Sequence, residues 1–176
     1  MDGYGVPASR KGMLPWSWAL ERLTRSHNYL LITVRPDGAP HVMPVWGVWL
    51  DGAWYFSTAA TSRKSRNLEH SAQCVVCNDH VEEAVILEGT AQRLEDEEIP
   101  KQAFVDYKAK YGWDLDPKRG PVWKVMPKTV FAMPEQQFPL GVTKWVFQSN
   151  NRKLEDLDHA GQSEEEVRDK ADRQGD

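Results

Sequence analysis

Residues 55–68 read YFSTAATSRKSRNL, a stretch that runs from an apolar strand through a hydroxyl-rich loop into a helix. Ser62 is a typical N-cap, which leaves the first-turn N–H groups and the positive end of the helix free to meet an anion. Arg63 and Lys64 follow at once and add two cations. Hydroxyl donors precede them at Ser57, Thr58 and Thr61. The composition is that of a phosphate cradle, although it lacks the glycines of a P-loop. The alternative is an ordinary capped helix with solvated cations.

The residues before this stretch predict a β-meander. Residues 29–34 (YLLITV) read as a strand, and Pro36-Asp37-Gly38 is a turn in which proline fixes φ and glycine accepts a positive φ. A second strand covers residues 40–50, and Asp51-Gly52 is a strong signal for a two-residue hairpin. Residues 53–58 form the returning strand.

The remaining elements are predicted from the same patterns of periodicity and turn chemistry. Helices are expected over 15–26, with Pro15 in the first turn, and over 96–111, where Pro100 allows a start a few residues later. Further strands are expected over 73–79, 84–94, 129–133 and 142–147, with Gly89 at a bend or bulge and residues 112–120 as a loop. The fold class is therefore mainly β, or α+β: six or seven antiparallel strands in a small barrel, with two or three short helices.

The second strand, over residues 40–50, is apolar on both of its faces. Residues at even positions include Val42, Trp46 and Val48, and those at odd positions include Met43 and Val45. A barrel interior accounts for one face, so the other must meet a partner subunit or a ligand, unless a long helix covers it. Pro44 cannot donate to a ladder, which places it at an edge or a bulge.

Cys74 and Cys77 form a C-x-x-C pair within a β-branched run. A zinc site would need a second pair of ligands, and the only local candidates are His70 and His80. In a strand, side chains three residues apart point to opposite faces. We therefore interpret both cysteines as small core residues, and we assign no metal site.

Charge and length exclude several classes of protein. The net charge is −4, and residues 148–176 account for it with nine acids and five bases. The body of the chain is then neutral, which argues against a nucleic-acid-binding protein. We find neither a transmembrane segment nor a secretory signal, so we expect a cytoplasmic protein. The expected organisation is an N-terminal arm over 1–14, one domain over 15–147, and a polar acidic tail over 148–176, disordered or loosely helical.

Taken together, the hairpin over 33–46, the strand over 54–58 and the Ser62-Arg63-Lys64-x-Arg66-Asn67-Leu68 motif resemble the FMN-binding split barrel of the pyridoxamine 5′-phosphate oxidase-like superfamily. The sequence is similar in particular to the flavin- and deazaflavin-dependent oxidoreductase branch. The resemblance continues through 87–91 to 143–147, and so it covers residues 15–147.

The resemblance implies a role for each matching position. Ser62, Arg63 and Lys64 would hold the cofactor phosphate, and Ser57 and Thr58 would lie near the ribityl chain. The further positions that the resemblance places at the cofactor are the backbone of Pro44, Val45 and Trp46 at the flavin ring, Asn67, and Trp145 in its own or the partner subunit's site. It also implies a homodimer with two sites at the subunit interface, in agreement with the two-sided apolar strand.

We therefore expect an oxidoreductase that uses FMN or the deazaflavin coenzyme F-420 for hydride transfer to a small organic acceptor. The Arg-Pro-Asp-Gly hairpin and the Trp145 region favour the deazaflavin. Oxidation of pyridoxamine phosphate itself does not fit, because the second strand lacks additional basic residues and the tail is acidic. The catalytic residues are unknown. No hydrolase triad or nucleophile elbow is visible in the sequence. Two alternatives stay open: a non-catalytic flavin-binding sensor or carrier, and a haem-binding split barrel that uses His41 or His70.

Overall fold

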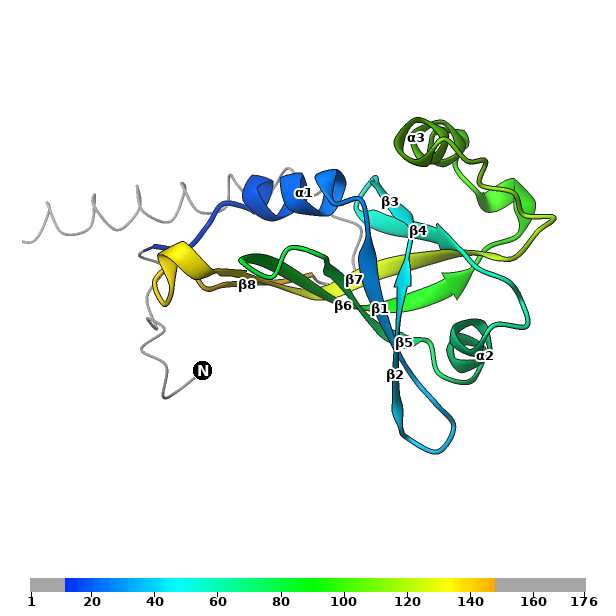
Figure 1. Ribbon diagram of the computed structural model, residues 1–176, viewed down its shortest axis with the longest axis horizontal. Helices are drawn as coiled ribbons and strands as arrows, with labels where there is room; N and C mark the ends of the chain where they lie inside the picture. The colour runs from blue at the N-terminus through cyan, green and yellow to red at the C-terminus, as the bar shows by residue number, and fades with distance from the viewer. Residues whose placement is uncertain (1–11, 148–176) are drawn as a thin grey trace, which may run out of the picture.

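In the computed structural model, residues 12–147 are described, and they form one antiparallel sheet with three α-helices (Figure 1). The strands are β1 Tyr29–Val34, β2 Pro40–Val45, β3 Gly47–Leu50, β4 Ala53–Ser57, β5 Gln73–Asn78, β6 Glu83–Arg93, β7 Val122–Pro134 and β8 Thr143–Val146. The helices are α1 Trp16–Arg25, α2 Arg63–His70 and α3 Lys101–Tyr111, with short 3₁₀ turns at Asp96–Glu98 and Glu135–Gln137. The predicted arm and acidic tail fall mostly on residues 1–11 and 148–176, which lie outside the described part of the chain.

The order of the strands is β2-β1-β5-β6-β7-β4-β3, and β8 pairs with β7. β2 and β3 follow each other in the chain but lie at opposite ends of this order, so the sheet curls, with Trp46 at the corner. This arrangement confirms the predicted mainly β, antiparallel split barrel.

The prediction of one continuous strand over 40–50 is wrong. Pro44 cannot donate to a ladder, and a side chain at Gly47 would overlap the buried indole of Trp54. The strand therefore breaks at Trp46, and the two halves pair with different neighbours, β2 with β1 and β3 with β4. This break raises the number of strands in residues 12–147 from the predicted six or seven to eight.

Two other boundaries differ from the predictions. The strand expected over 129–133 begins at Val122, because β7 continues past Pro127 through a bulge opposite Glu88 and Gly89, where a bend or bulge was predicted. The helix expected over 96–111 is a separate 3₁₀ turn followed by α3. Pro100 occupies the N-cap of α3, since a proline inside the helix would remove a hydrogen bond.

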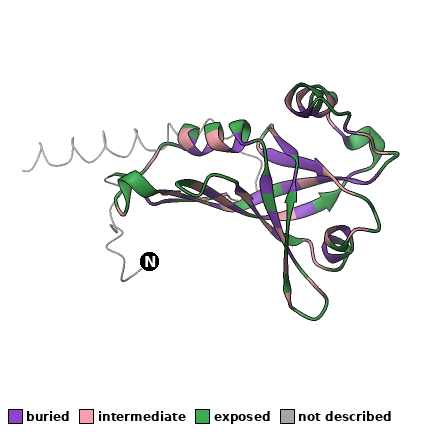
Figure 2. Cartoon of the chain, in the orientation of Figure 1, coloured by how far each residue is buried: buried purple, intermediate pink, exposed green. Residues whose placement is uncertain are grey.

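The main core lies where α1 packs against β6 and β3. Trp16, Ala19 and Leu23 of α1 are buried against strand residues such as Leu31 and Trp54. Figure 2 shows the buried residues gathered in the central strands, while the hairpin tip between β1 and β2 is exposed. Among residues 12–147, no helix is long and apolar enough to cross a bilayer.

The two cysteines lie in β5 on opposite faces of the sheet and form no disulfide. Cys74 is buried, and burial raises the pKa of its thiol to about 12. Cys77 is half-buried, and burial raises its pKa too. Both thiols are thus protonated at neutral pH, which agrees with their interpretation as packing residues.

Candidate functional site

The start of α2 is built as the sequence predicted. The Ser62 hydroxyl accepts the backbone N–H of Ser65 at 3.2 Å, which caps the helix. Thr58 lies against this cap, with 3.2 Å between its hydroxyl oxygen and that of Ser62. Ser57 instead donates to the carbonyl of Gly120 at 3.2 Å and so ties the loop before β7 to the end of β4. A side chain at position 120 would overlap the Thr58 carbonyl, so this approach of the two backbones requires glycine.

The two cations of the first turn have no acidic partner among residues 12–147. Arg63 is exposed, whereas Lys64 is half-buried, and burial lowers the pKa of its amine. A half-buried ammonium without a counter-ion is unfavourable. An anion at this helix start would relieve that cost.

The hairpin between β1 and β2 brings two more basic groups to the same place, Arg35 and His41. The pKa of His41 is lowered by burial and then by the positive charges of Arg35, Lys64 and Arg63. The packing of α2 against β1 brings the hairpin and the helix start together. His41 Nδ1 and Arg35 Nε are buried without a hydrogen-bond partner in the described chain. From the sequence, His41 was expected near the site, as a strand residue on its rim or as an alternative haem ligand, and Arg35 was given no role of its own, although both flank the hairpin turn.

Asn67 connects α2 to this hairpin. Its side chain is 1% exposed, and its amide donates to the Thr33 hydroxyl at 2.9 Å. Thr33 in turn pairs with His41 across the β1–β2 ladder. Asn67 is therefore placed to position the helix start against Arg35 and His41. Its Oδ1 atom is buried and has no partner in residues 12–147.

The segment Pro44-Val45-Trp46 lies at the other end of β2. Pro44 is exposed, Val45 is buried and Trp46 is 37% exposed. At the usual strand rise, Pro44 lies about 10 Å from His41 along β2. The indole of Trp46 stacks on Tyr111 with 4.9 Å between ring centroids and donates to the Asn28 side chain at 3.1 Å. The site is thus elongated, with basic groups at one end and a fixed aromatic ring near the other.

Trp145 is not brought into this site within one chain. It lies in β8 opposite Val130 and packs against Trp16 with 5.4 Å between ring centroids. Figure 1 shows β8 and α2 well separated along the long axis of the molecule. Of the two predicted placements, the one in its own chain's site does not fit this position, and the one in a partner subunit's site stays a prediction.

The family model described as pyridoxamine 5′-phosphate oxidase matches residues 19–133, more than half of the chain. The chain belongs to this family. No curated protein matches the sequence. The match spans the whole candidate site described above, from the hairpin through α2.

Solved structures of the same fold bind different cofactors. An F420 reductase is 21% identical with a TM-score of 0.52, and the match covers 62% of this chain and 93% of the reductase. A haem-binding protein from Mycobacterium smegmatis is 20% identical with a TM-score of 0.62, covering 76% of this chain and 59% of that protein. An FAD-binding protein from Mesorhizobium loti is 15% identical with a TM-score of 0.52, covering 66% and 92%. At these identities the matches establish the pyridoxamine 5′-phosphate oxidase-like fold and do not identify the cofactor.

Because Asn67 bonds Thr33 inside the protein, truncation of the Asn67 side chain should lower the stability of the fold. Asn67→Ala removes a buried hydrogen bond and should lower the free energy of unfolding by about 1–3 kcal/mol. Urea denaturation measures this loss. The exposed neighbour Arg66 is the control, because Arg66→Ala should change stability by less than about 0.5 kcal/mol. Equal stabilities of the two variants would contradict the anchoring role.

Proposed function

We propose that this protein binds FMN or coenzyme F-420 and transfers hydride to a small organic acceptor as a homodimer. The observation that carries the proposal is the set of four basic groups at the capped start of α2: Arg35, His41, Arg63 and Lys64. Membership of the pyridoxamine 5′-phosphate oxidase family and the fold shared with an F420 reductase and an FAD-binding protein support it.

The residues present fit a phosphate-bearing cofactor. Free N–H groups of the first turn and uncompensated cations favour an anion at the helix start. The unpartnered Nδ1 of His41 and Nε of Arg35 are further hydrogen-bonding groups at that position. Lys64, which lacks an acidic partner in the described chain, would gain one in the phosphate.

The cofactor, when bound, supplies the hydride chemistry. The protein's own part is then to hold the phosphate with Ser62, Arg63 and Lys64 and to place the ring along the backbone of Pro44, Val45 and Trp46. Ser57, the last residue of β4, and Thr58, which follows it, would lie near the ribityl chain. No acid–base pair is assigned to the reaction.

A second copy of the chain is the proposed partner. The β1–β2 register puts Leu30, Ile32 and Val34 on one face with Pro40, Val42 and Pro44. Leu30 is 42% exposed and Val42 is 53% exposed. A contiguous apolar face of this kind marks an interaction surface, and a homodimer would cover it in both copies at once.

Haem binding is the competing function, because a haem-binding protein shares the fold. His41 is a poor ligand for haem iron here because the positive charges of Arg35, Lys64 and Arg63 act on it and would oppose a cation at the same place. His70 lies at the exposed C-terminal end of α2, away from the basic groups at its start. The same site in a non-catalytic flavin carrier would show binding without turnover of any acceptor.

Replacement of the first-turn cations tests the proposed phosphate contact. A hydrogen bond to a charged group contributes about 1.5–3 kcal/mol, so Arg63→Ala and Lys64→Ala should each weaken FMN or F-420 binding roughly 10- to 150-fold. Arg66→Ala is the matched control, since Arg66 lies one turn farther along the helix and should matter much less. Parent-like binding by both variants in a titration would refute the proposal.

Binding should also depend on the protonation of His41. Its pKa is lowered in the empty protein, and a bound phosphate anion should raise it, so binding takes up a proton and tightens as the pH falls. Between about pH 8 and pH 5.5, the affinity of the wild type should rise by up to about tenfold relative to that of His41→Gln. The ratio of the wild-type affinity to the His41→Gln affinity is taken at each pH. The titration of the phosphate itself affects both proteins equally and so cancels. A ratio independent of pH would exclude His41 from the anion site.

The dimer is tested by sedimentation at micromolar concentration. The wild type should sediment as a dimer, and Val42→Lys should shift it toward the monomer, because a charge would be buried in the apolar contact. Val81→Lys is the control, since Val81 is 85% exposed in the loop between β5 and β6. A monomeric wild type would contradict the proposed partner.

A further inference from the structure

The corner between β2 and β3 is held at its backbone by the last turn of α3. The hydroxyl of Tyr111 accepts the N–H of Gly47 at 3.0 Å and donates to the Gly47 carbonyl at 2.8 Å. A single side chain thus bonds both backbone groups of Gly47, the first residue of β3. The indole of Trp46 stacks on the same phenol ring with an interplanar angle of 10°.

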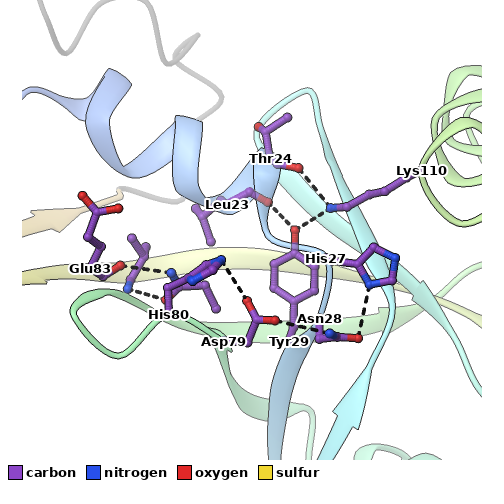
Figure 3. Close-up of polar contacts among 11 residues, drawn as sticks. Leu23, Thr24, His27, Asn28, Tyr29, Asp79, His80, Glu83 and Lys110 are labelled. Atoms are coloured by element: carbon purple, nitrogen blue, oxygen red, sulfur yellow. Dashed lines mark hydrogen bonds and ion pairs between the residues drawn. The ribbon is translucent and has the colours of Figure 1, made fainter.

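Lys110 joins this corner to two other elements (Figure 3). Its ammonium donates to the Thr24 carbonyl in the last turn of α1 at 3.0 Å, to the Tyr29 hydroxyl at the start of β1 at 2.8 Å, and to the Gly47 carbonyl at 3.3 Å. All three of its donors are therefore used, and each goes to a different segment. The amine also lies 4.9 Å from the centroid of the Tyr29 ring.

The position of Lys110 is costly for a charged group. Burial lowers the pKa of its amine to about 8, although the negative charge of Asp79 acts in the opposite direction. No carboxylate is bonded to this ammonium among the described residues. An apolar side chain would pack here without the cost of desolvating an ammonium. The hydrogen bonds of Lys110 are therefore what this residue adds to the fold.

The neighbours of Trp46 restrict the indole from other sides. Its N–H donates to Asn28, and Asn28 in turn donates to the Asp79 carboxylate at 3.3 Å. The His27 ring lies edge-on to the indole with 6.1 Å between centroids. A partly exposed tryptophan with this many contacts has one orientation, as a preorganised binding surface requires.

We propose that Lys110 is a positioning residue for the ring end of the cofactor site: with Tyr111 it fixes the Trp46–Gly47 corner against which the cofactor ring lies. The proposal rests on the function proposed above. It assigns the ring end to α3, an element far in sequence from the phosphate cradle, and it separates the residues that hold the ring from those that hold the phosphate.

The test compares FMN with riboflavin, which has the same ring and no phosphate, in Lys110→Met. Because Lys110 acts at the ring end, this variant should lose at least about tenfold in affinity for both ligands. Arg63→Ala should lose affinity for FMN only. Lys110→Arg keeps the charge and donors and should bind both ligands within about threefold of the wild type. If only the deazaflavin binds, coenzyme F-420 and its phosphate-free chromophore replace the two ligands.

Near-UV circular dichroism of the cofactor-free protein gives a second readout. The contribution of Trp46 is the difference between each protein and the same protein with Trp46→Phe, and it should largely disappear in Lys110→Met. The matched control is Lys108→Met in the same helix, because Lys108 is exposed and the one polar partner of its ammonium among residues 12–147 is Asp114, at 3.0 Å. If Lys110→Met does not fold, Tyr111→Phe takes its place with the same expected losses, since it keeps the stacking ring and removes the hydroxyl.

The outcomes separate the two proposals. A folded Lys110→Met variant that keeps both the Trp46 signal and wild-type affinity for riboflavin overturns the positioning role and leaves the proposed function intact. A loss confined to FMN would also overturn it, because Lys110 would then act at the phosphate. If the wild type binds neither flavin nor deazaflavin, the proposed function is wrong and the positioning role falls with it.

Discussion

The passage of Gly47 over the buried indole of Trp54 is the constraint on which the rest of the structure depends. Only a residue without a side chain can make this approach, and it ends one strand and starts another. β2 then pairs with β1 and β3 pairs with β4, so the two halves reach opposite edges of a curled sheet. The exposed Trp46 side chain is a direct result, because it occupies the corner where neither ladder continues.

The same strand that ends at this corner begins at the basic cluster. His41 lies near the start of β2 and faces the cations of α2, while Pro44 and Val45 lie at its end. The separation of the two ends is set by the strand rise and cannot vary while the β1–β2 ladder is intact. Asn67 holds α2 to β1 at one end, and Tyr111 and Lys110 hold α3 to Gly47 at the other. A rigid strand thus spans a site whose two walls come from separate helices.

The local parts of this site could be predicted from the sequence, and the long-range parts could not. The Ser62 cap, the cations of α2 and the hairpin turn depend on neighbouring residues, and the structure contains them as expected. The division of residues 40–50 depends on Trp54 and Tyr111, and the position of Lys110 depends on elements up to 86 residues away in the chain. Periodicity carries no information about such contacts. Arg35 was missed for the same reason, since its relation to Lys64 exists only after α2 docks on β1.

Both ends of the site contain a positive charge that is partly removed from water, but the two charges differ in how they are compensated. At the corner, Lys110 is compensated within the fold by two carbonyls and a phenol. At the start of α2, the positive charges lower the pKa of His41, and no acid of the described chain pairs with Arg63 or Lys64. The hydrogen bonds of Lys110 are complete without a ligand, so they fix the conformation of the corner. The cations at the start of α2 have no acidic partner in the described chain and therefore favour an anion. Binding of that anion would stabilise the folded protein by mass action. The corner is thus preorganised by the fold, whereas the basic end would gain most from a bound anion.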